Sequence, residues 1–225
     1  MLGVNFLREV VLDTETTGLS PKKGDRVVEI GCVELINHVA TGKYFHEYIN
    51  PEREMPQKAQ EVHGLSDAFL CDKPIFSNIS DAFAEFIGSS PLVIHNAEFD
   101  MNFLNWELKL IGLTPLPIER AIDTLELARE KFPGSQASLD ALCRRYQIDN
   151  SDRNFHGALK DAKLLADVYL ELIGGRQQHM DLATKKNAEI YVTKKETFEK
   201  RPHRPSPEEE ALHKDFIKKI HRPIW

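Results

Sequence analysis

In the first 50 residues, hydrophobic and polar positions form three short strand-like runs, and the second run roughly alternates between the two. The runs read EVVLDTE, RVVEIGCVEL and KYFHEYIN, and Gly, Pro or Asn residues set them apart, as in ATGK between the second and the third. Runs of this kind between such breaks are typical of β-strands. We therefore expect an antiparallel meander of three strands at the beginning of the chain.

Helical periodicity begins after the sequence PEREMP. In IFSNISDAFAEFIG the apolar residues Ile75, Ile79, Phe83 and Phe86 recur close to the helical period. A short apolar run, PLVIH, then precedes a helical run over about 99–111. The segments AIDTLELAREKF, SLDALCRRY and HGALKDAKLLADVYLELI add a strand and three helices. This order predicts an α/β fold, with a mixed sheet covered on its faces by helices.

The composition changes at Gly174 and Gly175, after the last of these helices. The segment that follows, 176–205, is charged and has no sustained period, which is typical of a flexible linker. The sequence SPEE at 206–209 then carries an N-cap serine, a proline at the first helical position and a glutamate three residues after the cap. We therefore expect a body at 1–175, a linker at 176–205 and a helical tail at 206–225.

The tail helix would align Leu212, Phe216 and Ile220, with Ile217 beside them, before the chain ends on Trp225. A helix of about 14 residues is marginal by itself in water. It could fold back on the body or lie in a groove of another protein. We favour docking to another protein, because the apolar stripe has no second layer within the tail.

The composition fits one folded domain with an appendage, since 41% of the 225 residues are hydrophobic. No run approaches the roughly 18 apolar residues of a membrane span, and MLGVNFLREV is too weakly apolar for a signal peptide. We therefore expect a cytoplasmic protein. Cys32, Cys71 and Cys143 are far apart and form no C-x-x-C pair. We expect them to be reduced core residues, without a disulfide or a zinc site.

The net charge of −6 is unevenly distributed. The segment 174–225 has 12 basic against 8 acidic residues, which leaves 17 against 27 in 1–173 and a charge of −10 there. Affinity for a phosphate backbone depends largely on Lys and Arg contacts. If the substrate is a nucleic acid, another component must therefore deliver it to this body.

Two carboxylates, Asp13 and Glu15, stand two positions apart at the end of the first strand, just before the sequence TTG. A strand places such residues on the same face, where their charges repel each other. The pair is therefore either a polar strand end that enters a glycine turn or part of a cation site.

Other acids follow at the ends of later segments. Asp100 comes in the first turn of a helix after the PLVIH strand, a position where capping alone can explain an aspartate. Asp161 falls on the border of the apolar stripe of the last body helix, so it faces the edge of the sheet. His156, five residues earlier, cannot share that face, and we expect it on the mobile loop that enters the helix.

Four carboxylates and a histidine in one cleft would suit two hard divalent cations, which prefer oxygen ligands. Two such ions can stabilise the attacking and the leaving oxygens of a phosphoryl displacement. A neutral histidine could accept the proton of the attacking water, because its ordinary pKa lies near neutral pH. Without cations, four acids at one site would repel strongly.

The segments VVLDTETTGL, VIHNAEFDMNFL and HGALKDAKLLADVYLEL resemble the three motifs of the DEDD-type 3′–5′ exonucleases with histidine in the third motif. The resemblance covers about residues 8–175. It implies a ribonuclease H-like fold and two Mg²⁺ or Mn²⁺ ions, with His156 as general base. By the same resemblance, the metal ligands are Asp13, Glu15, Asp100 and Asp161.

Further segments resemble the family of proofreading exonuclease subunits of bacterial DNA polymerase III. They read FHEYINPERE, VHGLSDAFLCDKP, AIDTLELAREKFPGSQASLDALC and DNSDRNFHGALKDA. The resemblance implies that His63 contacts the nucleotide being removed, although a turn histidine before Gly64 is the alternative. Lys58 stands where close relatives often carry a glutamate that touches substrate, so its role is in doubt. His95 and Asn96 resemble supporting residues of the second motif.

The tail resembles the partner-binding segments of the same family. Gln177, Met180 and Leu182 fit the Q-x-x-M-x-L peptides that bind the bacterial sliding clamp, and LHKDFIKKIHRPIW resembles the segment that holds the polymerase (alpha) subunit. A small theta-like subunit is a further expected partner. Such tethering would give the acidic body a high effective concentration of its substrate.

The expected function is removal of mismatched 3′ nucleotides from primer DNA as nucleoside 5′-monophosphates. Thr14, Thr16 and the backbone around Gly18 would then lie beside the bound nucleotide. One alternative is an exoribonuclease of the same motif family that trims RNA. Another is a replisome adaptor without catalysis, although an adaptor would have no use for the repulsion among the acids.

Overall fold

The computed structural model describes residues 6–151, 155–174 and 204–220. These residues belong to two compact units, one ending at Met180 and the other beginning at Asp181. Four residues predicted to bind partners lie outside the described residues: Gln177, Met180, Leu182 and Trp225. Within the described ranges, no helix is long and apolar enough to cross a membrane.

The first unit is built on the predicted meander. The strands β1 (Arg8–Thr16), β2 (Val27–Ile36) and β3 (Val39–Tyr48) pair antiparallel in chain order. Asp13 lies opposite Gly31 on β2 in this register, and Glu15 lies opposite Glu29. The strand-like runs between Gly, Pro and Asn breaks thus predicted the three strands and their antiparallel arrangement.

Two short strands complete the sheet on the other side of β1. The strand β4 (Leu92–Ile94) pairs parallel with β1, and β5 (Ala121–Asp123) pairs parallel with β4, which gives the order β3-β2-β1-β4-β5. The central strand β1 is buried on both faces. Val10 and Leu12 belong to one hydrophobic core, and Val11 belongs to the other.

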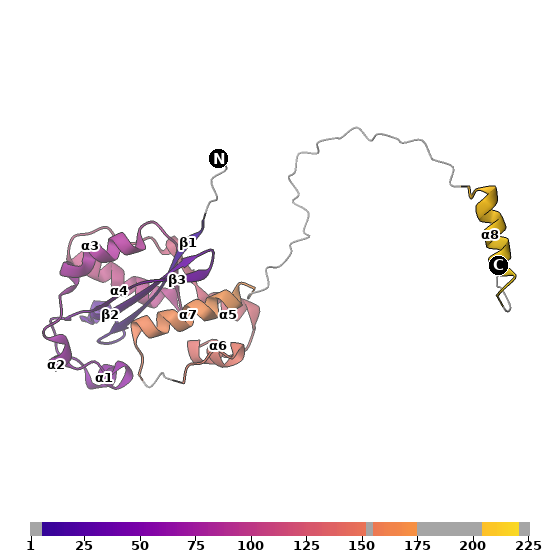
Figure 1. The fold of residues 1–225 in the computed structure, drawn as a ribbon. Coiled ribbons are helices and arrows are strands. Elements are labelled where there is room, and N and C mark those ends of the chain that lie inside the picture. Colours follow the sequence, from indigo (N-terminus) through magenta and orange to yellow (C-terminus); the bar gives the residue numbers. More distant parts are fainter. Residues whose placement is uncertain (1–5, 152–154, 175–203, 221–225) are drawn as a thin grey trace. The chain divides into compact units, whose positions relative to one another are not determined.

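Helices cover both faces of the sheet, as Figure 1 shows. The first core contains α3 (Phe76–Ile87) and α4 (Ala97–Leu110). The second contains α5 (Thr124–Lys131), α6 (Leu139–Tyr146) and α7 (Ala158–Leu172). The α/β fold with a mixed, helix-covered sheet is therefore confirmed.

The structure adds two helices that the hydrophobic period did not predict. They are α1 (Gln57–His63) and α2 (Asp67–Leu70). Two short 3₁₀ helices, η1 (Pro21–Lys23) and η2 (Ile118–Arg120), occur elsewhere in the chain. The sequence of α1, QKAQEVH, offers almost no apolar stripe. Gly64 ends α1 in the left-handed conformation, with a φ of 76°. Met55 and Leu70 pack with Val28 in a small third core.

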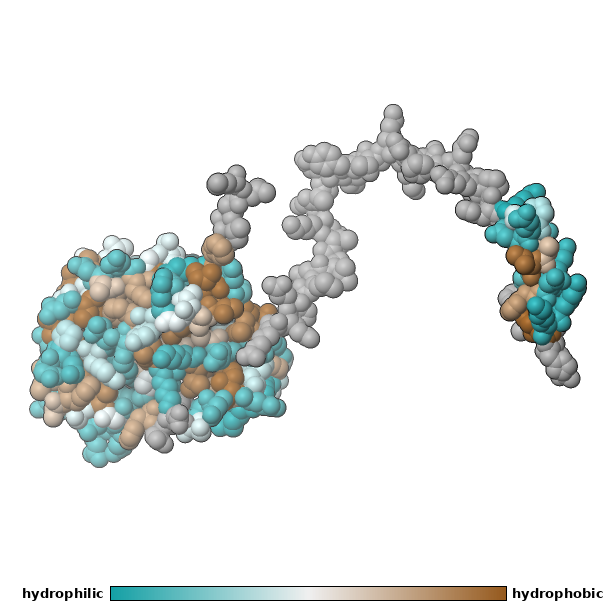
Figure 2. All heavy atoms as spheres, viewed as in Figure 1, coloured by the Kyte–Doolittle hydropathy of each residue, from teal (hydrophilic) through white to brown (hydrophobic). Residues whose placement is uncertain are grey.

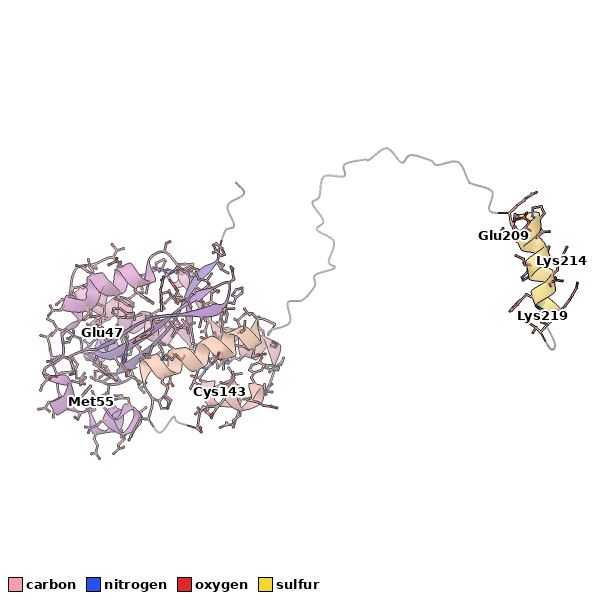
Figure 3. All side chains as sticks on the ribbon, viewed as in Figure 1. Glu47, Met55, Cys143, Glu209, Lys214 and Lys219 are labelled. Carbon is pink, nitrogen blue, oxygen red and sulfur yellow. The ribbon has the colours of Figure 1, made fainter. Side chains whose placement is uncertain are left out.

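Two expectations about side chains and helix length were wrong. Cys32 and Cys143 are buried, but Cys71 is exposed, because it follows the short surface helix α2. Figure 3 labels Met55 and Cys143 on the first unit. In the second unit, α8 (Pro207–Ile217) has 11 residues, so Ile220 lies beyond its end.

The beginning of α8 matches its sequence signal. The Ser206 side chain accepts a hydrogen bond from the Glu209 backbone N–H, and the Glu209 carboxylate accepts one from the Ser206 N–H. Three glutamates occupy the first turn, where their negative charges interact favourably with the positive end of the helix dipole. Figure 3 labels Glu209 near the beginning of α8, Lys214 farther along the helix and Lys219 just after its end.

Candidate active site

The predicted ligands come from three elements and line one cavity of about 460 Å³. Asp13 and Glu15 lie at the end of β1, and Asp100 lies in the first turn of α4. Asp161 lies in the first turn of α7. His156 precedes α7, as expected, and lines the same cavity.

Asp100 is fixed by the strand beside it. The backbone N–H and the hydroxyl of Thr14 both donate to Asp100 Oδ1, at 3.0 and 2.7 Å. Thr14 also lines the cavity, so it stands beside the expected position of a nucleotide and holds a carboxylate in place. The second role depends on contact between β1 and α4, which no local pattern in the sequence reveals.

The beginning of α4 is held by Asp123, at the end of β5. Its two carboxylate oxygens accept from the backbone N–H groups of Asn96 and Ala97, at 3.1 and 3.0 Å. Asn96 has a φ of 64°, an uncommon conformation that turns the chain sharply into the helix. His95 makes a hydrogen bond to the Thr124 hydroxyl, at 2.9 Å. His95 and Asn96 are thus structural neighbours of the acids, and Asp123 is a supporting residue that sequence reasoning missed.

Asp161 reaches the cavity because α7 approaches β2 very closely. The point of contact is Gly31, where an added Cβ would collide with the backbone of Ala158 and Leu159. Gly31 pairs with Asp13, so this approach sets the first turn of α7 next to the end of β1. A glycine inside a strand often marks such an approach, so a signal for it was present in the sequence.

Three of the predicted residues form a tight group. Ligand atoms of Glu15, His156 and Asp161 all lie within 4.8 Å of one another, and His156 Nδ1 is 3.5 Å from Asp161 Oδ2. The backbone N–H of His156 donates to the Val62 carbonyl at 3.1 Å. The loop that carries His156 is therefore attached to α1, whereas the sequence suggested a loop free to swing.

Burial is the largest influence on the carboxylates of the cavity, and repulsion between the acids adds to it. Burial, and then the charges of Asp100, Glu15 and Asp161, hold the pKa of Asp13 well above its usual range. Burial also raises the pKa of Asp100 to about 7, against the hydrogen bonds from Thr14. A nearby cation favours the ionised form of a carboxylate. Four carboxylates that line one cavity offer the oxygen ligands that hard divalent cations prefer.

A second, more apolar pocket of about 560 Å³ adjoins the cavity and contains the predicted substrate contacts. His63 is buried at the end of α1, and Lys58 lies on the same helix. Burial lowers the pKa of His63, which favours the neutral ring. Thr16 and Gly18 also line this pocket, as expected for residues beside a nucleotide.

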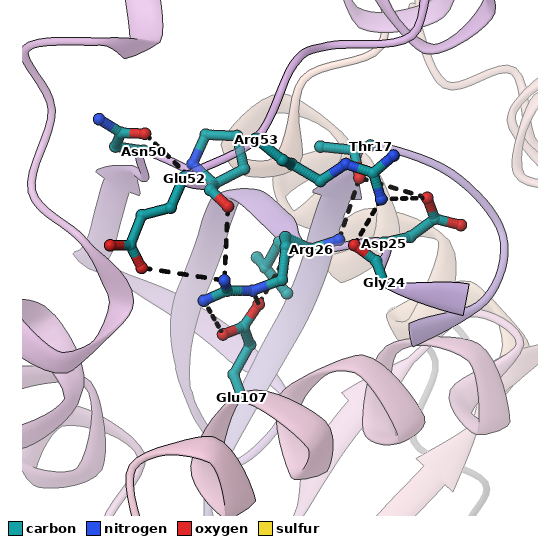
Figure 4. A network of polar contacts seen from close by, with 10 residues as sticks. Thr17, Gly24, Asp25, Arg26, Asn50, Glu52, Arg53 and Glu107 are labelled. Carbon is teal, nitrogen blue, oxygen red and sulfur yellow. Dashed lines mark hydrogen bonds and ion pairs between the residues drawn. The ribbon is translucent and has the colours of Figure 1, made fainter. Parts of the chain in front are cut away.

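The turn between β1 and β2 forms a wall of both spaces and is held by the network in Figure 4. Arg26 donates to both carboxylate oxygens of Glu107 on α4, from Nε at 2.7 Å and from Nη2 at 2.8 Å. Glu107 is only 1% exposed and also accepts from the Val27 N–H. Two parallel bonds of this kind fix orientation as well as distance.

A second part of the network closes the turn itself. Asp25 accepts from the Ser20 N–H at 3.0 Å and from Arg53 Nη1 at 2.9 Å, and Arg53 also donates to the Gly24 carbonyl. Gly18 lies against Asp25, where an added Cβ would meet the carboxylate. The turn therefore presents its outermost residue, Leu19, on a fixed support.

Comparison with known proteins agrees with this geometry. Residues 10–169 match the model of the exonuclease family RNase_T. A relative from Rickettsia conorii, described as DNA polymerase III subunit epsilon, is 50% identical over 225 residues, which cover 96% of this chain and 98% of that one. The chain belongs to the DNA polymerase III epsilon family. It is a metal-dependent 3′–5′ exonuclease with the proofreading activity of epsilon subunits.

Other members and neighbours extend the comparison. The epsilon subunit of Escherichia coli strain K12 is 46% identical over 177 residues, which cover 75% of this chain and 72% of that one. Exonuclease X, solved with 5′-overhanging duplex DNA, is 28% identical, with a TM-score of 0.58 over 73% of this chain and 90% of that one. The nuclease domain of 3′hExo, a DEDDh family member solved with rAMP, has a TM-score of 0.66 at 19% identity, over 76% of this chain and 93% of that one. The last likeness shows the shared fold.

Proposed function

We propose that this epsilon family member removes mismatched 3′ nucleotides from primer DNA through a two-cation site at the end of β1. The ligands are Asp13, Glu15, Asp100 and Asp161, and the ions are Mg²⁺ or Mn²⁺. The proposal is carried by the convergence of these carboxylates from three elements on one cavity. When bound, two divalent ions supply charge stabilisation at the attacking and leaving oxygens of a phosphodiester.

His156 acts as the general base in this proposal. Its side chain is 48% exposed, so it reaches solvent as well as the cavity. The ring accepts a proton from the attacking water, and the neighbouring Asp161 carboxylate stabilises the resulting imidazolium. The attachment of the His156 backbone to Val62 keeps the ring at the cavity mouth.

The terminal nucleotide binds in the apolar pocket next to the cavity. In this proposal His63 lies against its base or sugar, and Lys58, which also lines the pocket, meets a sugar or phosphate oxygen. A mispaired end frays more readily than a paired one, so it supplies the single-stranded nucleotide that this pocket accepts. Discrimination then requires no reading of the base sequence.

A labelled primer with a 3′ mismatch tests the assignment in the presence of Mg²⁺ or Mn²⁺. We expect Asp13→Ala to abolish release of nucleoside 5′-monophosphates and His156→Ala to slow it by about 100-fold or more. Asp81→Asn, a change of an exposed acid on α3, is the matched control. The assignment fails if the Asp13 and His156 variants digest the primer as fast as the control.

The second unit holds the polymerase subunit, called alpha, in this proposal. Leu212 and Phe216 of α8 are 72% and 63% exposed, and Figure 2 shows hydrophobic residues grouped on this helix between hydrophilic ones. An amphipathic helix of 11 residues gains most of its stability from packing against a partner. The sequence resemblance suggests Trp225 as a further contact, residues 177–182 as a clamp-binding peptide and a theta-like subunit as another partner.

Co-purification with the polymerase subunit tests this docking. We expect the double change Leu212→Gln and Phe216→Gln to abolish co-purification and to leave digestion of free oligonucleotides unchanged. Lys214→Gln, on the same helix, is the control. Undiminished co-purification of the double variant would contradict the proposal.

A further inference from the structure

A third space adjoins the catalytic cavity, between the turn that follows β1 and the outer side of α4. This groove has a volume of about 480 Å³. We call it the Trp106 groove. Its lining residues of interest are Leu19, Lys22, Phe99, Asn102, Trp106 and Lys109.

The Trp106 groove is continuous with the site already described. Leu19 and Phe99 line the groove, the cavity of the carboxylates and the pocket of His63. Leu19 is 86% exposed, although it is a large apolar residue on a turn held by the Asp25 and Arg26 network. The three spaces therefore meet at one apolar point, and a chain of nucleotides could pass from one to the next around it.

The chemistry of the groove suits a single-stranded nucleic acid. Trp106 is partly exposed, and Lys109 Nζ lies 5.9 Å from the centre of its ring. Lys22 comes from η1 on the opposite wall. Non-specific single-strand binding combines aromatic rings, on which bases stack, with cations that follow the phosphates. Two lysines beside a partly exposed tryptophan stand out on a body whose net charge is −10, and one acid, Glu98, also lines the groove.

The walls of the groove are fixed in advance. The buried pair of Arg26 and Glu107 joins the turn to α4, one residue along the helix from Trp106. Asn105, on the other side of Trp106, exchanges two hydrogen bonds with the backbone of Leu116, at 2.9 and 2.6 Å. Binding in a groove held at both walls requires little ordering of the protein, which favours affinity.

We propose that the Trp106 groove binds the nucleotide on the 5′ side of the scissile phosphate, with its base stacked on Trp106 and its phosphate near Lys22 and Lys109. This inference rests on the proposed function, which places the terminal nucleotide in the His63 pocket and the scissile phosphate at the carboxylates. The next nucleotide must then leave through a space that adjoins both. Among the described residues, the Trp106 groove is a space that shares Leu19 and Phe99 with each of them.

Tryptophan fluorescence tests the stacking directly. The chain has two tryptophans, so Trp225→Phe leaves Trp106 as the single reporter. In this variant combined with His156→Ala, with Mg²⁺ present, we expect an oligothymidylate to quench Trp106. Thymidine 5′-monophosphate, which fills the His63 pocket alone, should bind without this quenching. Equal quenching by both ligands, or none by the oligonucleotide, would overturn the inference.

Kinetics on two substrates separate this inference from the proposed function. We expect Trp106→Ala to raise KM for a single-stranded oligonucleotide by at least about 5-fold, the effect of one lost stacking contact. Hydrolysis of the nitrophenyl ester of thymidine 5′-monophosphate, which has no second nucleotide, should be unchanged. Trp106→Phe should restore most of the loss. If the ester is affected as strongly as the oligonucleotide, or neither is affected, the groove is not a nucleotide subsite.

Salt dependence separates the lysines from the tryptophan. Each phosphate contact on a single strand contributes about 0.7 to the slope of log affinity against log salt concentration. Lys22→Ala and Lys109→Ala should each reduce the slope by about that amount, and Trp106→Ala should leave it unchanged. Lys43→Ala, an exposed lysine on β3 that lines none of the three spaces, is the control. An unchanged slope in both lysine variants would overturn their role. If the wild-type chain does not digest oligonucleotides at all, the proposed function is refuted instead.

Discussion

Among single residues, the acids of the cavity combine function with a cost in stability. Burial raises the pKa of both Asp13 and Asp100 and so favours their protonated forms, and the charges of neighbouring acids add to the shift. Thr14 directs two hydrogen bonds at one oxygen of Asp100, which fix the position of the carboxylate and offset only part of the cost of burying its charge. Such a group is well placed for a cation and unfavourable without one.

Replacing Asp100 should therefore stabilise the metal-free protein. The pKa of Asp100 is about 7 in the fold, against an ordinary 3.8. Between these values the folded state holds the proton and the unfolded state does not, so the free energy of unfolding falls as pH rises from 4 toward 7. Asp100→Asn cannot ionise, and its Oδ1 can still accept from Thr14. In EDTA at pH 8 we expect its melting temperature to exceed that of the wild type by about 5 °C, with little difference at pH 4.

Mg²⁺ supplies the control for this experiment. A ligand that binds the folded state raises its apparent stability, so Mg²⁺ should stabilise the wild type more than Asp100→Asn. Asp81→Asn, on the surface of α3, should behave like the wild type throughout. Identical pH profiles of Asp100→Asn and the wild type in EDTA would contradict the assigned cause.

The sequence was informative about residues whose role is visible in a local pattern. Asp13, Glu15, Asp100 and Asp161 each stand at the end of a strand or the beginning of a helix, and the structure brings all of them to one cavity. Asp123 also stands at the end of a strand, where capping of the next helix explains it locally, but its oxygens hold a helix that begins about 26 residues earlier in the chain. Roles that depend on contacts between distant segments could not be read from spacing.

At the scale of elements, the decisive contact is the packing of α7 on β2. The strands and long helices follow from their periods, but α1 was missed because QKAQEVH has almost no apolar stripe. The distance between α7 and the sheet depends on Gly31, which has no side chain to separate them. This close approach places Asp161 beside Asp13 and Glu15.

Gly31→Ala should therefore damage catalysis through the position of α7. The added methyl group would meet the backbone of Ala158 and Leu159, so the first turn of α7 must move away from the sheet. A displacement of about 1 Å at a catalytic group can cost about 100-fold in rate, and we expect a loss of at least that size on a mismatched primer. Circular dichroism and melting would show whether the variant remains folded.

Gly157→Ala is the matched control for this prediction. Gly157 precedes the same helix, but an added Cβ there would meet nothing within 4 Å, and its φ of −159° suits any residue. Its activity should remain within a few-fold of the wild type. A folded Gly31→Ala variant with the activity of Gly157→Ala would show that the close approach is not needed.

For the whole molecule, the distribution of charge separates catalysis from capture of the substrate. The body has a net charge of −10 and offers few cations for a phosphate backbone, whereas the last 52 residues have a charge of +4. A catalytic unit of this kind can work at low affinity if a second unit holds it near the primer end. The exposed residues Leu212 and Phe216 of α8 suit such a tether.

Dilution distinguishes a tethered exonuclease from a free one. With the polymerase subunit bound to a mismatched primer, we expect the full chain to excise the mismatch at nearly the same rate at micromolar and nanomolar concentrations of exonuclease. The reason is that a short tether gives the exonuclease an effective concentration near the millimolar range at the primer end. The variant with Leu212→Gln and Phe216→Gln should lose activity in proportion to dilution, although it digests saturating free oligonucleotide normally. Lys214→Gln should retain the behaviour of the full chain. If the double variant tolerates dilution as well as Lys214→Gln does, α8 is not the tether. The acidic body must then capture primer ends through contacts of its own, and the Trp106 groove would be the first surface to test.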